Sequence, residues 1–340
     1  MVLHYLFPDN WVETRFFYAI LMGASTSLIG IFLAQLLFGA NSGLASVMFT
    51  AILIIPCMYK LINKLERVQE ERVAFSLKRL YNTNKNLIQA YMGIFIGVYL
   101  AYLLVSFFGN HLGWDVVSIF REQLFLDFAI QGRATYSFPT LWGILQNNWW
   151  VLLSCFGLSL MSGNGAVFFM VWNASSWGAI FGMRAVAAAT VLGQGTIKTL
   201  LILQAIVLPH VLLEGLAYVL AGIAGGVISR NVISQSAEMK RFLGLFALGI
   251  ISFFFANAFF KWFAGVPWII FLRMTFVMLV VFTLRLSFVK EKHRLVFKYN
   301  YWLFIIALLV FIIGGVVETG VLSWSGGLSR IYEAAAIYFM

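Results

Sequence analysis

The chain is poor in charged residues. Asp, Glu, Lys and Arg make up 11% of its 340 residues, whereas a soluble domain carries about 25%. The hydrophobic fraction is 62%, and several apolar runs reach the roughly 20 residues that span a bilayer. A soluble domain is therefore excluded. The fold class that we predict is all-α, a polytopic transmembrane helical bundle that crosses the cell (plasma) membrane several times.

Cysteine and histidine are also scarce. The two cysteines, Cys57 and Cys155, lie inside apolar runs, which argues against a disulfide framework. Of the four histidines, only His210 lies inside a predicted span. A metal site would need at least one further ligand beside His210 and Glu214, and only Glu318 or solvent could supply it. We expect neither a metal nor a cofactor.

Acidic residues are fewer than basic ones, which gives a net charge of +10. The basic residues gather in short loops, above all 60–86 and 285–298. The positive-inside rule explains such loops without a nucleic-acid partner and assigns them to the cytoplasm. With both loops on one side, we predict nine spans, a cytoplasmic N-terminus and an external C-terminus. The predicted spans are Phe16–Gly39, Leu44–Tyr59, Leu87–Gly109, Trp149–Trp172, Ala174–Leu192, Thr199–Ile228, Phe242–Phe260, Trp268–Arg285 and Tyr301–Trp324.

The predicted spans divide the chain into four parts. Residues 1–109 hold a transmembrane hairpin, the first basic loop and a third span. Residues 110–147 form an external connection, in which Val117, Phe120, Leu124 and Phe128 make an apolar stripe at helical spacing. This stripe fits an interfacial helix or, equally, an external cap helix. Residues 148–324 form a transmembrane core, and residues 325–340 form an external tail. Within 149–192, a re-entrant pair is an alternative to two full spans.

The most informative stretch is 209–226. His210 and Glu214 are one helical turn apart on one face, and Ala217 and Ala221 continue that face with little bulk. Ionisable groups inside a span are costly and usually point to a bundle interior or a wet cavity. Pro209 would kink the helix or end the preceding one. We weigh three roles for His210 and Glu214: half a metal site, a proton relay with Glu318, and structural hydrogen bonding between helices, which we favour.

A second polar segment precedes this stretch. Asn173 and Arg184 share a helix face, while Gly178 and Gly182 form a small-residue pair on the opposite face. We expect Arg184 and Glu214 to form a buried ion pair, so that the two polar faces pack together.

Two further features accompany these segments. Gly163-Asn164-Gly165 is either a kink or an unwound element beside a cavity. Glu318 follows Gly314 and Gly315 near the outer end of the last span, as a buried partner or an interfacial carboxylate.

These residues resemble the stage II sporulation protein M family of integral membrane proteins. Gly163 and Gly165 match its first element, and Asn173 with Gly178 matches its second. The third element, a Pro-His helix with a later Glu and a small-residue tail, matches the set Pro209, His210, Glu214, Ala217, Gly222 and Gly225, and Glu318 matches the late Glu of the last span. The resemblance covers about 147–320. Val211 and Ala174 stand where the family usually has glycine, which marks this chain as a divergent member.

The resemblance implies a non-enzymatic protein that serves as a scaffold or subunit of a membrane-protein complex. Its expected partners are the lipid bilayer and other membrane proteins or a second copy of the chain. The sporulation member acts with a cell-wall hydrolase during engulfment. The alternative is a transporter or channel-like permease whose polar pathway is lined by His210, Glu214 and Arg184. An intramembrane enzyme is a third possibility, although the chain carries no complete catalytic set.

Overall fold

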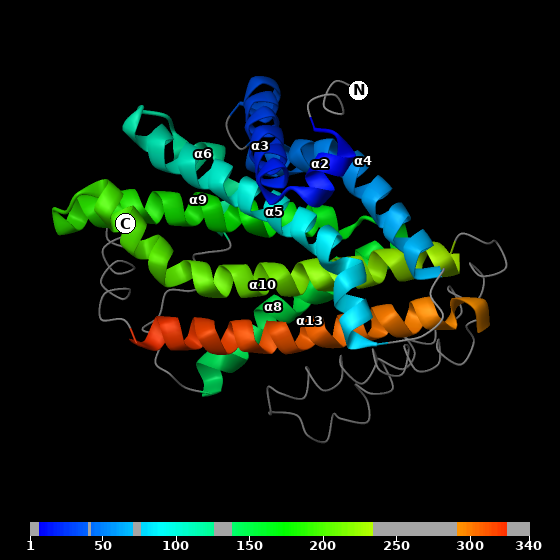
Figure 1. Cartoon of the computed structure of the whole chain (residues 1–340). Coiled ribbons are helices and arrows are strands. Elements are labelled where there is room, and N and C mark those ends of the chain that lie inside the picture. The colour runs from blue at the N-terminus through cyan, green and yellow to red at the C-terminus, as the bar shows by residue number, and fades with distance from the viewer. Residues whose placement is uncertain (1–6, 40–41, 71–75, 126–137, 234–290, 325–340) are drawn as a thin grey trace, which may run out of the picture.

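The structure, a computed structural model, describes residues 7–39, 42–70, 76–125, 138–233 and 291–324, and every regular element among them is an α-helix (Figure 1). The predicted all-α class is therefore confirmed. The helices are α2 (Asp9–Thr14), α3 (Phe16–Phe38), α4 (Gly43–Glu70), α5 (Leu77–His111), α6 (Val116–Ile119), α7 (Arg121–Phe125), α8 (Phe138–Ser162), α9 (Ala166–Leu192), α10 (Thr196–Ile233) and α13 (Glu291–Trp324).

Six of these helices contain a stretch that is long and apolar enough to cross a membrane. The stretches are Phe16–Phe38, Gly43–Leu65, Leu77–Gly109, Ala166–Leu192, Thr196–Ile228 and Val296–Val321. The chain is thus a membrane-embedded helical protein. Six candidate spans do not support the predicted count of nine, and the predicted spans 242–260 and 268–285 lie outside the described residues.

The helix boundaries between 138 and 192 differ from those that we predicted. Gly163-Asn164-Gly165 is a turn between α8 and α9, and α9 then runs without a break through Asn173. Gly163 has a φ of 80°, which glycine adopts at no steric cost. The Ser159 hydroxyl accepts a hydrogen bond of 2.8 Å from the Ala166 N–H and so caps the first turn of α9. The predicted boundaries at 172 and 174 were wrong, because α9 begins at the capped Ala166, eight residues before the predicted start at Ala174.

Long helices pack around α5 and α10. Helix α5 contacts α3 and α9, whereas α10 contacts α8, α9 and α13. Figure 1 shows α10 and α13 running side by side for most of their lengths. Glycines allow close approach at these contacts: a Cβ on Gly178 of α9 would lie 2.5 Å from the Tyr99 carbonyl oxygen of α5, and one on Gly182 would lie 2.6 Å from that of Leu103.

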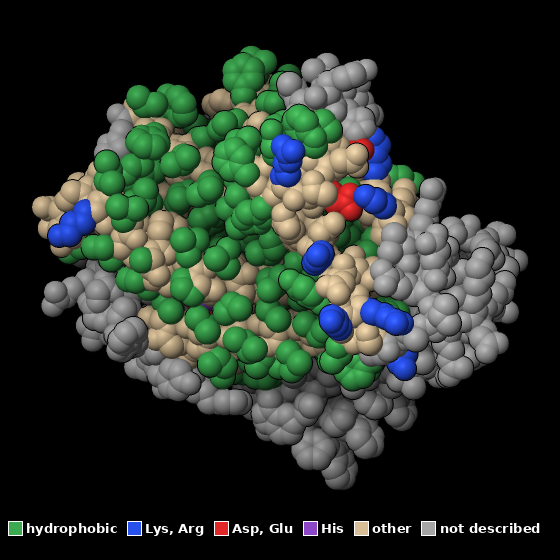
Figure 2. All heavy atoms as spheres, in the orientation of Figure 1, with side chains coloured by type: hydrophobic (Ala, Val, Ile, Leu, Met, Phe, Trp, Pro, Cys, Tyr) green, Lys and Arg blue, Asp and Glu red, His purple; other side chains and the backbone are tan. Residues whose placement is uncertain are grey.

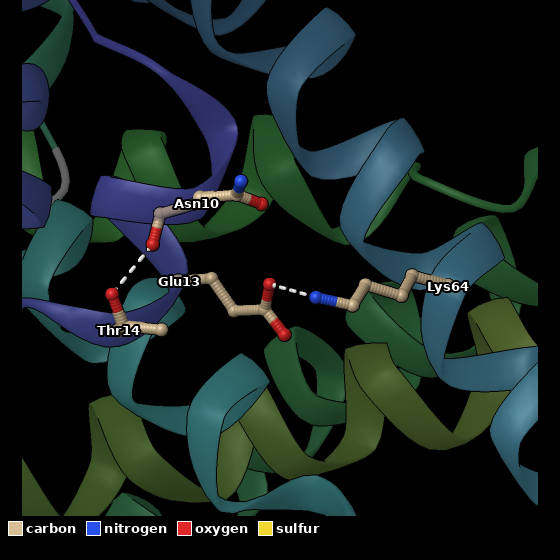
Figure 3. A network of polar contacts seen from close by, with 4 residues as sticks. All are labelled: Asn10, Glu13, Thr14 and Lys64. Carbon is tan, nitrogen blue, oxygen red and sulfur yellow. Dashed lines mark hydrogen bonds and ion pairs between the residues drawn. The ribbon is translucent and has the colours of Figure 1, made fainter.

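The N-terminal helix α2 is held against the end of α4. Lys60 forms an ion pair of 3.1 Å with Asp9, and Lys64 forms one of 2.6 Å with Glu13 (Figure 3). These pairs place α2 at the same end of the bundle as the basic segment that begins at Lys60. Figure 2 shows several Lys and Arg side chains near this end and mainly hydrophobic side chains across the middle of the visible face. We call this end of the bundle the basic end.

Other elements reach the same end. A Cβ on Gly226, near the end of α10, would lie 3.2 Å from Ile62 of α4 and closer still to the carbonyl oxygen of Gly163. The α8–α9 turn and the end of α10 therefore belong to the basic end. Helix α9 begins there, so the α9–α10 turn at Gly193 lies at the opposite end. Which end faces the cytoplasm stays a prediction.

The connection after α5 folds onto the bundle. Phe120, between α6 and α7, is fully buried with its ring centroid 5.4 Å from that of Tyr102. Gln123 is also buried, and its side-chain N–H donates to the Gly43 carbonyl oxygen at 3.0 Å. Val117, by contrast, is 47% exposed. These contacts favour the cap-helix alternative for this part of the connection. Phe128 lies outside the described residues.

Candidate functional site

Three helices bring polar side chains together inside the bundle. Asn148 of α8 donates a hydrogen bond of 2.7 Å to the Glu214 carboxyl oxygen Oε1 of α10. The Glu214 carboxyl group also hydrogen-bonds to that of Glu318 on α13. Glu214 is 2% exposed, and Glu318 is partly exposed. We call Glu214 and Glu318 the carboxyl pair.

Glycines on α13 make this meeting possible. A Cβ on Gly314 would lie 3.2 Å from Cγ of Glu214 and 3.5 Å from its backbone nitrogen. A Cβ on Gly315 would lie 2.7 Å from Leu145 of α8. The Gly314-Gly315 step therefore lets α13 approach α10 and α8 at once. Glu318 follows one turn after Gly314, so both face Glu214.

The carboxyl pair has a chemical requirement. An ionised carboxylate only accepts hydrogen bonds, so a hydrogen bond between two carboxyl groups needs a proton on one of them. Two carboxylates that share a site also resist carrying two negative charges together. A proton on one of the two groups would therefore act as the donor of this hydrogen bond and relieve the repulsion. Without that proton, two negative charges would lie side by side, and Asn148 would donate a hydrogen bond to only one of them, Glu214.

His210 and Pro209 lie one turn earlier on α10. His210 is buried, and its Nδ1 has no hydrogen-bond partner among the described residues. Pro209 stands inside α10, which continues from Thr196 to Ile233. Proline lacks an N–H and cannot complete the usual bond to the carbonyl four residues back. The helix therefore passes Pro209 rather than ending there.

The ion pair expected between Arg184 and Glu214 is not formed. Arg184 lies nine residues before Gly193, whereas Glu214 lies nineteen residues after Gly195, at the other side of the α9–α10 turn. With about 1.5 Å of rise per residue, this difference of ten residues separates the two levels by about 15 Å. Asn173 does not reach Glu214 either, because its amide donates to the Phe169 carbonyl oxygen of its own helix at 2.7 Å.

The expected packing between the two polar faces holds only in part. Glu214 faces α8 and α13, where Asn148, Gly314 and Glu318 lie. One turn later on α10, Tyr218 does contact α9, because Trp177 stacks on it with ring centroids 6.3 Å apart. The small residues of the predicted helix-packing set lie at close contacts. Gly222 approaches Ala166, Gly225 approaches the Phe156 backbone, Gly165 approaches Leu158, and Ala217 and Ala221 are fully buried.

Sequence reasoning missed Asn148 and Tyr218 as parts of this region. Asn148 fell just outside the predicted span, which was taken to begin at Trp149, whereas α8 begins at Phe138. An amide well inside a long helix was the available signal. In the described part of the chain, no group of three or more His, Cys, Asp or Glu side chains is placed to hold a metal ion.

Comparisons of the chain with models of protein families, with curated proteins and with solved structures find no match. The chemistry of the carboxyl pair and its neighbours is therefore the main guide to function.

Proposed function

We propose that this chain is a membrane permease in which the carboxyl pair takes up and releases a proton. The observation that carries this proposal is the hydrogen bond between the Glu214 and Glu318 carboxyl groups inside a bundle of apolar helices. A carboxylate at the centre of a membrane helix costs roughly 2.5–3.5 kcal/mol even on the lenient insertion scale. Glu214 lies near the middle of its span, and a buried carboxyl group placed beside a second one is an expensive way to hold helices together.

An amide would serve a purely structural role at lower cost. Asn and Gln both donate and accept hydrogen bonds without ionising, and Asn148 already plays that part toward Glu214. What carboxyl groups add is the ability to gain and lose a proton, which is the usual role of paired acidic groups within pumps and transporters. His210, one turn away with an unpartnered Nδ1 among the described residues, is a further group that can accept a proton. Arg184 takes no part in this proposal.

The experiment is proton flux into liposomes that contain the purified chain and a trapped pH-sensitive dye, under an imposed pH gradient and membrane potential. We expect faster flux than in protein-free liposomes and a return to that background in the Glu214→Gln and Glu318→Gln variants. The matched control is Glu13→Gln, which removes a carboxylate that pairs with Lys64 at the basic end. Wild-type flux equal to that of Glu214→Gln would rule out proton movement through the pair.

A second candidate, the scaffold or complex subunit that the resemblance implies, is favoured by a different observation. The glycines that carry the resemblance, Gly163, Gly165, Gly178, Gly222 and Gly225, lie at a helix turn or at close helix contacts. A motif made of such residues supports a shared helix-packing core rather than a shared activity. If the chain is such a subunit, we expect no proton flux above the background of protein-free liposomes. Mass measurements on the protein released from its native membrane should then show a defined homo-oligomer or a complex of fixed stoichiometry.

A further inference from the structure

An arginine at the basic end lies over two adjoining aromatic rings. Arg15 joins α2 to α3, and its guanidinium carbon Cζ is 5.3 Å from the centroid of the Trp11 ring and 5.6 Å from that of the Tyr18 ring. The two ring centroids are 4.9 Å apart. A guanidinium is attracted to the face of an aromatic ring. The rings therefore limit the directions open to a side chain that is otherwise exposed.

This arginine lies where a candidate span begins. Phe16, the next residue, is the first of the span Phe16–Phe38, and Trp11 is 42% exposed. Tryptophan and tyrosine are enriched at the depth of the lipid headgroups in membrane proteins. We therefore expect the Arg15 guanidinium to lie at headgroup depth rather than in hydrocarbon.

Helix α5 packs against the chain on both sides of Arg15. The Gln89 side-chain amide donates a hydrogen bond of 3.5 Å to the Thr14 carbonyl oxygen. One turn later, a Cβ on Gly93 would lie 3.1 Å from the Phe16 carbonyl oxygen. Gln89 and Gly93 share a face of α5 because they are four residues apart. This face of α5 is therefore the one that follows the α2–α3 junction.

Lys85 adds a second positive charge on that face. It precedes Gln89 by four residues, so it lies one turn away, about 6 Å along the helix axis. Its side chain is exposed. Since Gln89 contacts the residue before Arg15, α5 contributes a cation about one helical turn from the arginine.

The carboxylates of α2 are engaged elsewhere. Asp9 and Glu13 form ion pairs with Lys60 and Lys64 of α4, and Figure 3 shows Glu13 pointing to Lys64. In the part of the chain that the structure describes, neither of the two cations at the α2–α3 junction pairs with a carboxylate. Both cations are therefore available to an anion from outside the chain.

Exposed apolar side chains lead away from this junction along α3. They are Phe17, Leu21, Leu28 and Phe32, and successive members are four or seven residues apart, which keeps them on one helix face. The stripe begins two residues after Arg15. An anion bound at the arginine would therefore have an exposed apolar surface directly beside it.

We propose that Arg15 and Lys85, with the rings of Trp11 and Tyr18, bind the headgroup of an anionic phospholipid whose acyl chains lie along α3. The guanidinium offers two parallel N–H donors to a phosphate group, and the lysine ammonium adds a point charge. A soluble anion would use these charges alone, whereas the aromatic rings and the apolar stripe fit a lipid. The site is separate from the carboxyl pair and does not depend on the proposed function.

The test measures the mass of the purified chain in a neutral detergent after phosphatidylglycerol is added. Each bound lipid adds its own mass, so the fraction of protein with one bound lipid, followed against lipid concentration, gives a dissociation constant. We expect phosphatidylglycerol to bind about tenfold more tightly than phosphatidylcholine with the same acyl chains, because two basic residues face its headgroup.

Removing either cation should weaken the binding of phosphatidylglycerol. We expect Arg15→Gln to raise the dissociation constant about tenfold, the factor that one hydrogen bond between charged groups is worth. Lys85→Gln should raise it about fivefold, because lysine contributes as a point charge. The matched control is Lys198→Gln. Lys198 is also an exposed cation in the first turn of a candidate span, but it lies by the α9–α10 turn at the opposite end, and its loss should leave the constant unchanged.

A further pair of variants tests the aromatic rings. Trp11→Leu removes one ring face from the Arg15 guanidinium and should raise the dissociation constant about threefold, the value of a cation–π contact at an exposed site. Trp11→Phe keeps an aromatic face and should restore most of the affinity. Equal weakening by the two Trp11 variants would show that the ring does not position the arginine, contrary to the proposal.

Three other results would overturn the proposal. Equal affinities for phosphatidylglycerol and phosphatidylcholine would show that no anionic headgroup is selected. Equal weakening in Arg15→Gln and Lys198→Gln would show that the overall charge of the chain, rather than a site, attracts the lipid. Glycerol phosphate carries the phosphate without acyl chains, and if it displaced the lipid at an equal concentration, the site would be one for a soluble anion.

Discussion

Glu214 has partners that lie far away in the chain. Asn148, which donates to it, lies 66 residues earlier, and Glu318 lies on the last described helix. The Asn148–Glu214 bond is of the stronger kind whenever the carboxyl group carries charge. The positions of Asn148 and Glu318 relative to Glu214 depend on how α8 and α13 are aligned along α10, which contacts both helices.

The first prediction concerns Asn148→Leu. Leucine removes the amide donor and leaves the Glu214 oxygen Oε1 buried without its 2.7 Å hydrogen bond. We expect the free energy of unfolding in detergent to fall by about 1–3 kcal/mol, the cost of an unsatisfied buried polar group. Thermal melting of the purified chain measures it.

Asn147→Leu is the control for this prediction. Asn147 is the neighbouring asparagine, but it is exposed, and its amide contacts Asn148 rather than Glu214. Its replacement should change stability by less than about 0.5 kcal/mol, as for most surface substitutions. Equal effects of the two variants would show that the bond to Glu214 contributes nothing.

Among the helices, close contacts depend on glycines that face a neighbour's backbone. Gly178 and Gly182 of α9 face α5, Gly222 and Gly225 of α10 face α9 and α8, and Gly314 of α13 faces Glu214. Lipid tails are as apolar as the helices, so association in a membrane relies on close packing more than on the hydrophobic effect. These close contacts therefore contribute much of the free energy of association between the helices.

The second prediction compares two glycines of adjoining helices. In Gly225→Ala, the added methyl would approach the Phe156 carbonyl oxygen more closely than a real Cβ can, so we expect a loss of roughly 1–3 kcal/mol through overpacking. In Gly157→Ala on α8, no described atom lies within 4 Å of the added methyl. There we expect a gain of up to about 1 kcal/mol from helix propensity. Melting curves that shift in the same direction for both would contradict the role of Gly225 as a contact residue.

At the scale of the whole molecule, the two ends of the bundle differ. The α2–α4 ion pairs, the α8–α9 turn and the end of α10 share the basic end. The α9–α10 turn and the α7 cap on Gly43 lie at the other. The ion pairs at the basic end are exposed and worth no more than about 1 kcal/mol each. These ion pairs hold α2 beside α4 but contribute little to the free energy of unfolding.

The third prediction is that the basic end of the bundle faces the cytoplasm. In a Cys57→Ala, Cys155→Ala background, Lys64→Cys should be protected from a membrane-impermeant thiol reagent in intact cells, because basic segments stay in the cytoplasm. Gln194→Cys, exposed in the α9–α10 turn, should be labelled. Opening the cells should make Lys64→Cys reactive as well. Labelling of Lys64→Cys alone would reverse the orientation.

The sequence by itself determined the class of the molecule. A chain with 11% charged residues and repeated apolar runs can satisfy its backbone within a membrane only as helices or a closed barrel, and the lengths of the runs fit helices. The positions that pack closely were also predictable, because a helix face made of small residues at helical spacing lets the backbone of another helix come close. His210 and Glu214 stood out for a local reason, because ionisable groups inside an apolar run are costly wherever they lie.

Only the tertiary structure decided which partners these groups have. Arg184 and Glu214 look paired in the sequence, yet the α9–α10 turn sets them at different levels. Likewise, α9 begins at Ala166 because Ser159, on the preceding helix, caps it, and Asn173 is simply absorbed into the helix. A side chain's chemistry is local, but its partner is set by the register of helices joined through distant turns. Glu214 therefore meets Asn148 and Glu318 for a reason that no stretch of sequence around it contains.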